Sequence, residues 1–246
     1  MIERRRIELQ SGQVLRIDGP AFIRVFKGRL KIFGKELAPR DYVIIPRAKS
    51  GTVEALEDTI AELRIGEGSA IDELKVSFIP PGWESLASIV KLYDEPRILV
   101  LGGVDSGKTV LCTYLANTLV EAGHKVAVID EDVGQSEIGP PTTVSLGLVE
   151  RPVPSLKESE FKDAYFVGST SPAGYSARIL AGVERMIRRA KELGATSIIL
   201  NTSGFIHGWE AREIKLTLSS ILSPNVIVAI EKAQEMEHVL GQFRRI

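Results

Sequence analysis

Gly102, Gly107, Lys108 and Thr109 occupy the four fixed positions of the phosphate-binding pattern G-x-x-x-x-G-K-[ST]. In this pattern, backbone N–H groups close around the phosphates, and the positive end of the following helix adds to the attraction. Lys108 is expected to reach the β- and γ-phosphates, and the Thr109 hydroxyl is expected to ligate Mg²⁺. The predicted nucleotide site also includes the neighbouring residues Gly103, Val104, Asp105, Ser106 and Val110. A coincidental glycine-rich turn is the alternative interpretation.

A second group of chemically competent side chains follows the apolar run 125–130. Asp130 and Asp132 stand at alternate positions in the segment Asp-Glu-Asp-Val-Gly-Gln. One carboxylate could hold Mg²⁺, directly or through water, and the other could accept a proton from an attacking hydroxyl, as phosphoryl transfer requires. An acidic, solvated loop is the alternative.

These loops need a sheet to position them, and the chain from residue 94 onward alternates strand and helix patterns. Strands are expected at 97–101, 125–130, 164–168, 196–202 and 225–231, and helices near 108–122, 174–193 and 210–222. This order predicts parallel βαβ units, with the ligand at the carboxyl ends of the strands. The segment 152–160 is expected to be a mobile surface loop, and the chain is expected to enter another strand at Phe243.

The first 75 or so residues have a different pattern, in which short β-prone runs are separated by glycine turns. The predicted fold is therefore an α/β P-loop domain with a mostly parallel sheet, preceded by a small all-β sandwich or barrel. The expected boundaries are 1–77 for the all-β domain, 78–93 for a linker and connecting helix, and 94–246 for the P-loop domain.

Composition limits the remaining possibilities. The formal net charge of −1 excludes a wholly basic surface, so any nucleic-acid contact must be local. Cys112 is the single cysteine, which excludes an internal disulfide, and it is expected to be a buried apolar residue. No stretch approaches 18 uninterrupted apolar residues, and no apolar run follows the N-terminal charges. We therefore expect a soluble, cytoplasmic protein without a membrane segment.

Taken in order, several motifs resemble those of the polynucleotide 5′-hydroxyl kinases of the RNA cleavage-factor and pre-rRNA-processing type, in their archaeal form. The matching segments are 102–109, 130–146, 166–172, 201–208 and 225–230. They extend over most of residues 78 to 232, and the small β module fits the family's N-terminal domain. The resemblance implies transfer of the γ-phosphate of ATP, with Mg²⁺, to the 5′-hydroxyl of RNA, with DNA left open as an acceptor.

The resemblance also implies roles for individual residues. Lys108 would act on ATP, Asp132 would be the base for the 5′-hydroxyl, and Asp130 would support the metal with Thr109. Gln135 would orient groups around the metal. A clasp over the nucleic-acid backbone would comprise Ser169, Thr170, Ser171 and Pro172. The alternative for the clasp is a turn that caps the helix starting near residue 174.

The chain departs from the family pattern in two places. Where the family often has a tryptophan that stacks on a substrate base, this chain has Phe205, with Trp209 four residues later. Phe205 could instead fill the domain core. Family members continue into a lid that carries arginines over the triphosphate and then into a C-terminal β domain, so we expect the P-loop domain to be incomplete at its C-terminus and to lack both. The lid arginines have no obvious counterpart, and Arg178, Arg185, Arg188 and Arg189 on the helix near 174–193 are expected to form a solvated face. Two alternatives to a kinase follow: a non-catalytic ATP-binding scaffold in an RNA-processing complex, or a P-loop NTPase unrelated to RNA.

Overall fold

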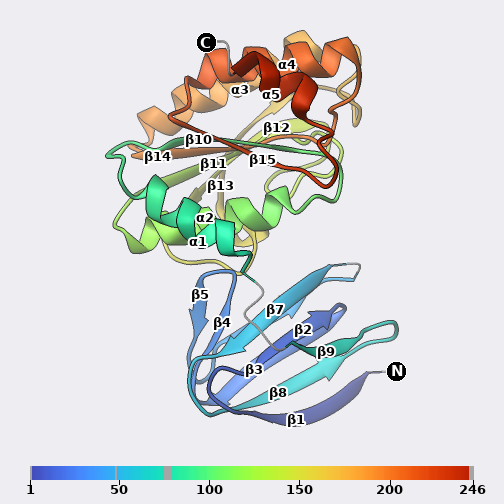
Figure 1. Ribbon diagram of the computed structural model, residues 1–246, viewed down its shortest axis with the longest axis vertical. Coiled ribbons are helices and arrows are strands. Elements are labelled where there is room, and N and C mark those ends of the chain that lie inside the picture. The colour runs from blue at the N-terminus through green and yellow to red at the C-terminus, as the bar shows by residue number, and fades with distance from the viewer. Residues whose placement is uncertain (1, 48, 75–78, 244–246) are drawn as a thin grey trace. The chain divides into compact units, whose positions relative to one another are not determined.

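A computed structural model describes residues 2–47, 49–74 and 79–243 (Figure 1). Contacts divide the chain into two compact units, Met1–Ser85 and Leu86–Ile246. The first unit is all-β and the second is α/β, which confirms the predicted fold class. Within the described ranges, no helix is both long enough and apolar enough to span a membrane.

The N-terminal unit is a sandwich of two antiparallel sheets. One sheet has the order β1-β8-β3-β6, and the other has the order β5-β4-β7-β2-β9. Alternate residues of both sheets, among them Ile23, Leu63 and Val53, form one buried core. The strands are β1 (Glu3–Leu9), β2 (Val14–Asp18), β3 (Ala21–Lys27), β4 (Leu30–Ile32), β5 (Lys35–Leu37), β6 (Tyr42–Ile45), β7 (Ser50–Ala55), β8 (Thr59–Ile65) and β9 (Ile71–Leu74).

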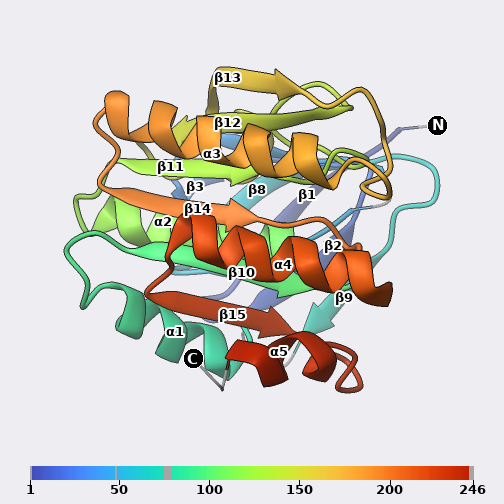
Figure 2. The ribbon, with the colours of Figure 1, turned by 90° about the horizontal axis from the view of Figure 1, so that it is seen from above.

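The second unit is built on a six-stranded sheet of order β13-β12-β11-β14-β10-β15 (Figure 2). Its strands are β10 (Arg97–Gly102), β11 (Val126–Asp130), β12 (Thr143–Val149), β13 (Glu160–Phe166), β14 (Ser197–Asn201) and β15 (Val226–Ile230). The helices are α1 (Pro81–Val90), α2 (Lys108–Glu121), α3 (Ser176–Glu192), α4 (Gly208–Leu222) and α5 (Glu237–Phe243). Helices α3 and α4 cover one face of the sheet, and α2 covers the other (Figures 1 and 2).

The sheet is mostly parallel, as predicted, but the expected parallel βαβ units do not extend to one of its edges. Strand β12 was not predicted, and it pairs antiparallel with β11, as does β13 with β12. The chain between Asp130 and Thr143 forms no helix, so it returns as a hairpin and cannot make the crossover that a parallel neighbour requires. The strand expected at 164–168 is the end of this antiparallel β13.

Two further expectations are corrected. Phe243 lies in α5 instead of a strand, because Val239 and Leu240 pack on the domain core as a helical turn; residues 244–246 are outside the described part. The segment 152–160 is anchored instead of being a free loop. The buried Asn117 side chain accepts a hydrogen bond from Val153 N and donates one to Val153 O, and a short 3₁₀ turn follows at Leu156–Glu158.

Candidate active site

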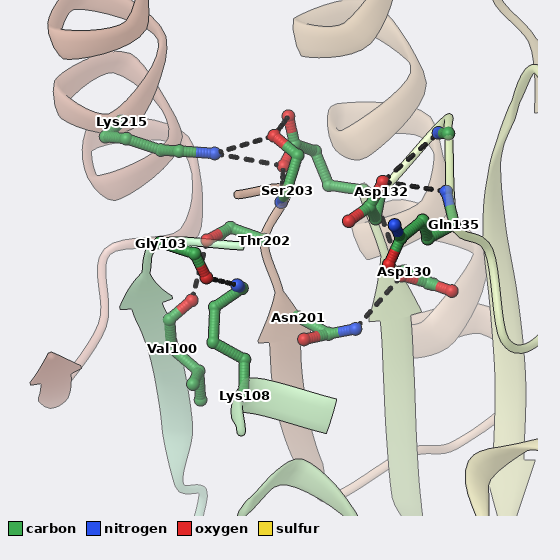
Figure 3. Close-up of polar contacts among 12 residues, drawn as sticks. Val100, Gly103, Lys108, Asp130, Asp132, Gln135, Asn201, Thr202, Ser203 and Lys215 are labelled. Carbon is green, nitrogen blue, oxygen red and sulfur yellow. Dashed lines mark hydrogen bonds and ion pairs between the residues drawn. The ribbon is translucent and has the colours of Figure 1, made fainter. Parts of the chain in front are cut away.

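The predicted site residues gather at the carboxyl ends of three neighbouring strands. Strand β14 lies between β10 and β11 and pairs parallel with both. The P-loop follows β10, the acidic loop follows β11, and Asn201 ends β14 between them (Figure 3). Parallel strands present their carboxyl ends on the same edge of the sheet, where ligands bind in this class of fold.

The P-loop has a backbone conformation that only glycine adopts easily. Gly102 has φ 156° and Gly107 has φ 98°. A Cβ atom on Gly102 would lie 2.6 Å from Ser106 Oγ and 2.8 Å from the Ile230 carbonyl oxygen. The second fixed glycine, Gly107, is the N-cap of α2, so the free N–H groups of the helix start face the loop.

Lys108 is the first residue of α2, and its side chain folds back over the loop. Its Nζ donates a hydrogen bond of 2.6 Å to the Gly103 carbonyl. Burial lowers the pKa of Lys108, and the positive charge of Lys215 lowers it further. The Ser106 hydroxyl is buried, with no hydrogen-bond partner in the described part of the chain. A buried cation with one carbonyl partner and an unpaired hydroxyl fit a phosphate-bearing ligand, because its oxygens would satisfy both.

The loop after β14 supports the P-loop from the neighbouring strand. A Cβ atom on Gly204 would lie 2.7 Å from Val104 N and 2.6 Å from its Cγ2. Only glycine permits this approach without a shift of the P-loop. The Thr202 hydroxyl donates to the Val100 carbonyl at 2.7 Å. Gly204 and Thr202 both lie in the motif 201–208, but the motif alone did not indicate these contacts.

Asp130 organises the acidic loop from a fully buried position. Its Oδ2 accepts hydrogen bonds from Glu137 N at 2.7 Å and Ser136 Oγ at 3.2 Å. Its Oδ1 accepts from Asn201 Nδ2 at 3.1 Å and, more weakly, from Asp132 N at 3.3 Å. Burial raises the pKa of Asp130 to about 7, against the effect of the Glu137 N–H. With both oxygens occupied, a contribution to metal binding through water fits this geometry better than direct ligation.

Asp132 is more accessible than Asp130, and its carboxylate accepts fewer hydrogen bonds. Its Oδ1 accepts hydrogen bonds from Gly134 N at 3.1 Å and Gln135 N at 3.0 Å, which fix the orientation of the carboxylate. The side chain is half-buried, and Gln135 is exposed beside it. The other oxygen, Oδ2, receives no recorded hydrogen bond from the described residues. It can therefore accept a proton from an incoming group.

A buried ion pair near the candidate site was not predicted from the sequence. Lys215 Nζ lies 3.2 Å from Glu131 Oε2 and 3.0 Å from Ser203 Oγ, and both charged side chains are 0% exposed (Figure 3). The same carboxylate accepts hydrogen bonds from the backbone N–H and hydroxyl of Ser203. A signal was available, because Lys215 lies on the apolar face of α4 with Ile214 and Leu218.

The predicted clasp lies against the acidic loop. A Cβ atom on Gly134 would be 2.7 Å from the Thr170 carbonyl oxygen, so the two segments touch. Ser169 Oγ accepts a hydrogen bond from Ser171 N at 3.0 Å, which closes a tight turn before Pro172. Helix α3 starts later, at Ser176, without a side-chain N-cap. The hydroxyls of this turn therefore do not cap α3.

Two aromatic residues at and just before the start of α4 differ in exposure. Phe205 is half-buried and packs against the domain core, whereas Trp209, in the first turn of α4, is 78% exposed. Glu210 accepts a hydrogen bond from Gly174 N at 2.9 Å, which ties the start of α4 to the end of the clasp loop. Trp209 is thus the better placed ring for an external ligand.

The arginines of α3 mostly form the solvated face that the sequence predicts. Arg185, Arg188 and Arg189 are at least 42% exposed and pair with surface carboxylates. Arg178 differs, because its Nη1 donates to the Val167 carbonyl at 3.0 Å, just before the clasp.

Comparison with known proteins shows which family this chain belongs to. Residues 102–245 match the family described as the mRNA cleavage and polyadenylation factor CLP1 P-loop. The chain belongs to the CLP1 P-loop family. The CLP1 match begins at Gly102 and includes all the loops described above.

Relatives of this CLP1-family chain include archaeal proteins named polyribonucleotide 5′-hydroxyl-kinase. That of Methanocaldococcus jannaschii is 39% identical over 161 residues, which are 65% of this chain and 44% of the relative. That of Thermococcus kodakarensis is 40% identical over 152 residues, 61% of this chain and 42% of the relative. The chain thus spans under half the length of these curated relatives. A solved structure of Clp1p with Pcf11p shares the fold, with a TM-score of 0.75 over 98% of this chain and 64% of that one, at 16% identity.

Proposed function

We propose that this chain binds ATP with Mg²⁺ and transfers the γ-phosphate to the 5′-hydroxyl end of RNA. The observation that carries the proposal is the presence of Asp132 beside a P-loop. Two loop N–H groups hold its Oδ1, and its Oδ2 accepts no hydrogen bond from the residues that the structure describes. The names of the archaeal relatives support the same activity.

The P-loop residues would hold the triphosphate. The N–H groups at the start of α2 and the Lys108 ammonium would neutralise the β- and γ-phosphates, and the Ser106 hydroxyl would gain a partner. Thr109 would hold Mg²⁺, with Asp130 acting through water, and the ion would neutralise charge on the transferred phosphoryl group. Asp130 also positions its neighbour, because it accepts the Asp132 N–H.

Asp132 would act as the base. The 5′-oxygen of the RNA attacks the γ-phosphorus, the hydroxyl proton passes to Asp132 Oδ2, and the bond between the γ-phosphorus and the β,γ-bridging oxygen breaks to release ADP. The clasp, Ser169 to Pro172, would hold the RNA backbone through its hydroxyl and N–H groups. Gln135 would orient the reacting end, and Trp209 offers the exposed ring for a substrate base.

The test is transfer of labelled γ-phosphate from ATP to a short RNA with a 5′-hydroxyl, with the matching DNA in parallel. Asp132→Asn should lower the rate of transfer by about 10²- to 10⁴-fold while ATP affinity is retained. Lys108→Ala should abolish transfer and weaken ATP binding. Asp72→Asn, an exposed aspartate of the N-terminal unit, is the matched control and should be silent. Full transfer by Asp132→Asn would refute the assigned base.

A further inference from the structure

The N-terminal sandwich carries a second surface with chemistry of its own, on the outer face of the sheet β1-β8-β3-β6. Residues such as Ile23 and Leu63 point into the core, so the alternate residues of the same strands face outward. Cross-strand pairing places eight of them in two neighbouring rows. The first row is Arg4, Arg64, Phe22 and Ile44, and the second is Arg6, Glu62, Arg24 and Tyr42.

One part of this face is a stack of planar groups. The rings of Phe22 and Tyr42 lie 5.4 Å apart at 25° between their planes, and the Arg64 guanidinium lies 5.0 Å from the Phe22 ring centre. Arg64 and Tyr42 come from the strands on opposite sides of β3, so the three groups form a series across the sheet. The series ends at Tyr42, which is 56% exposed, beside Ile44, which is 60% exposed.

The other part of the face is a group of arginines from three strands. Arg4, Arg6, Arg24 and Arg64 surround Glu62, which is only 3% exposed beneath them. Glu62 forms ion pairs with Arg4 and Arg64, and the hydrogen bond from Arg64 is the main cause of the lowered pKa of Glu62. One buried carboxylate thus holds Arg4 and Arg64, and the four arginines outnumber Glu62 in a chain whose net charge is −1.

We propose that this outer sheet face binds single-stranded RNA. An unpaired base would extend the stack at Tyr42, and the arginines would contact the flanking phosphates. The charge and the exposed ring together favour a nucleic acid over a protein partner, because each supplies one half of single-strand recognition: backbone charge and base stacking. The choice of RNA over DNA rests on the proposed function, whereas the site itself does not include any P-loop residue.

The test is fluorescence anisotropy with a 5′-fluorescein RNA of 12 nucleotides and the full chain. The blocked 5′ end cannot accept phosphate, so binding is read independently of transfer. Tyr42→Ala should weaken binding by about 5- to 150-fold, the usual effect of losing one stacked base, and Tyr42→Phe should retain it. Arg24→Gln should lower the slope of log affinity against log salt by about 0.7. Exposed Tyr93 and Arg16 supply the matched controls Tyr93→Ala and Arg16→Gln, which should match the wild type.

Several results would overturn the proposal. These are absence of binding by the wild type in 50 mM salt, unchanged binding by Tyr42→Ala, competition by duplex RNA as effective as by single strands, and equal affinity for the same sequence as DNA. Loss of binding in Lys108→Ala would also overturn it, since the RNA would then occupy the P-loop site. If the wild type binds the blocked RNA but transfers no phosphate, the proposed function fails while this surface stands.

Discussion

Removing the positive charge beneath the site should strongly destabilise the second unit. Lys215 and Glu131 are both 0% exposed. Among the described residues, Lys215→Met would leave the Glu131 carboxylate with the Ser203 N–H and hydroxyl as its only donors. Breaking a buried ion pair on one side costs about 3–5 kcal/mol, because the remaining charge stays buried without its partner. For a unit of this size, 1 kcal/mol corresponds to roughly 2–4 °C, so the transition of this unit should fall by about 6–20 °C.

Scanning calorimetry measures the loss of stability in Lys215→Met. The double variant Glu131→Gln with Lys215→Met tests whether the unpaired charge of Glu131 causes that loss. If the unpaired charge is the cause, neutralising Glu131 should recover at least about half of the lost free energy of unfolding. Arg188→Met is the matched control, because Arg188 forms an exposed pair with Glu184 that contributes no more than about 0.5 kcal/mol. A Lys215→Met transition within 2 °C of the wild type, or a double variant no more stable than the single one, would refute the reasoning.

Three further outcomes are expected. Gly204→Ala pushes a methyl group against the P-loop backbone, so calorimetric titration should show ATP binding weakened by about 5- to 150-fold. The control is Gly241→Ala, where the space is open, and this variant should bind ATP normally. Equal ATP affinities of the two variants would contradict the close approach of Gly204 to the P-loop. Burial raises the pKa of the Cys112 thiol, which should stay protonated at about pH 8.5 and react with iodoacetamide at least about 100-fold faster in urea than in the native protein; rapid native labelling would be inconsistent with its burial. Trp209→Ala should raise the KM for RNA by about 5- to 150-fold with kcat retained, and an unchanged KM would remove the ring from the substrate site.

The elements around the P-loop could be predicted from the sequence because their signals are local. The apolar run before Gly102, the fixed glycines and the helical spacing after Lys108 lie within a few turns of chain, and β10 and α2 follow them closely. The choice of partner strand is not local. After Asp130 the chain could form a crossover helix that leads to a parallel strand, or it could turn back as an antiparallel strand. The outcome depends on whether the intervening residues form a helix, which the sequence pattern did not indicate, and β12 was missed for that reason.

The same distinction applies to the site. Asp130 and Asp132 could be proposed from the sequence because they follow a predicted strand, whereas the pairing of Glu131 with Lys215 joins residues 84 positions apart on different elements. Phe205 packs on the core and Trp209 is exposed, but the sequence of a loop that runs into a helix gives no clear sign of which ring faces the core. The arginine and aromatic face of the β module depended on strand register, which short β-prone runs do not specify.

The position of β14 sets the distance between the two loops of the candidate site. Neighbouring strands lie about 4.8 Å apart, so the insertion of one strand separates the ends of β10 and β11 by about 10 Å. Direct pairing of β10 with β11 would halve that gap and place the P-loop and the acidic loop on adjacent strands. The strand order instead holds the P-loop and the acidic loop one strand apart, which in the proposed reaction would leave Lys108 beside the nucleotide and Asp132 beside the acceptor.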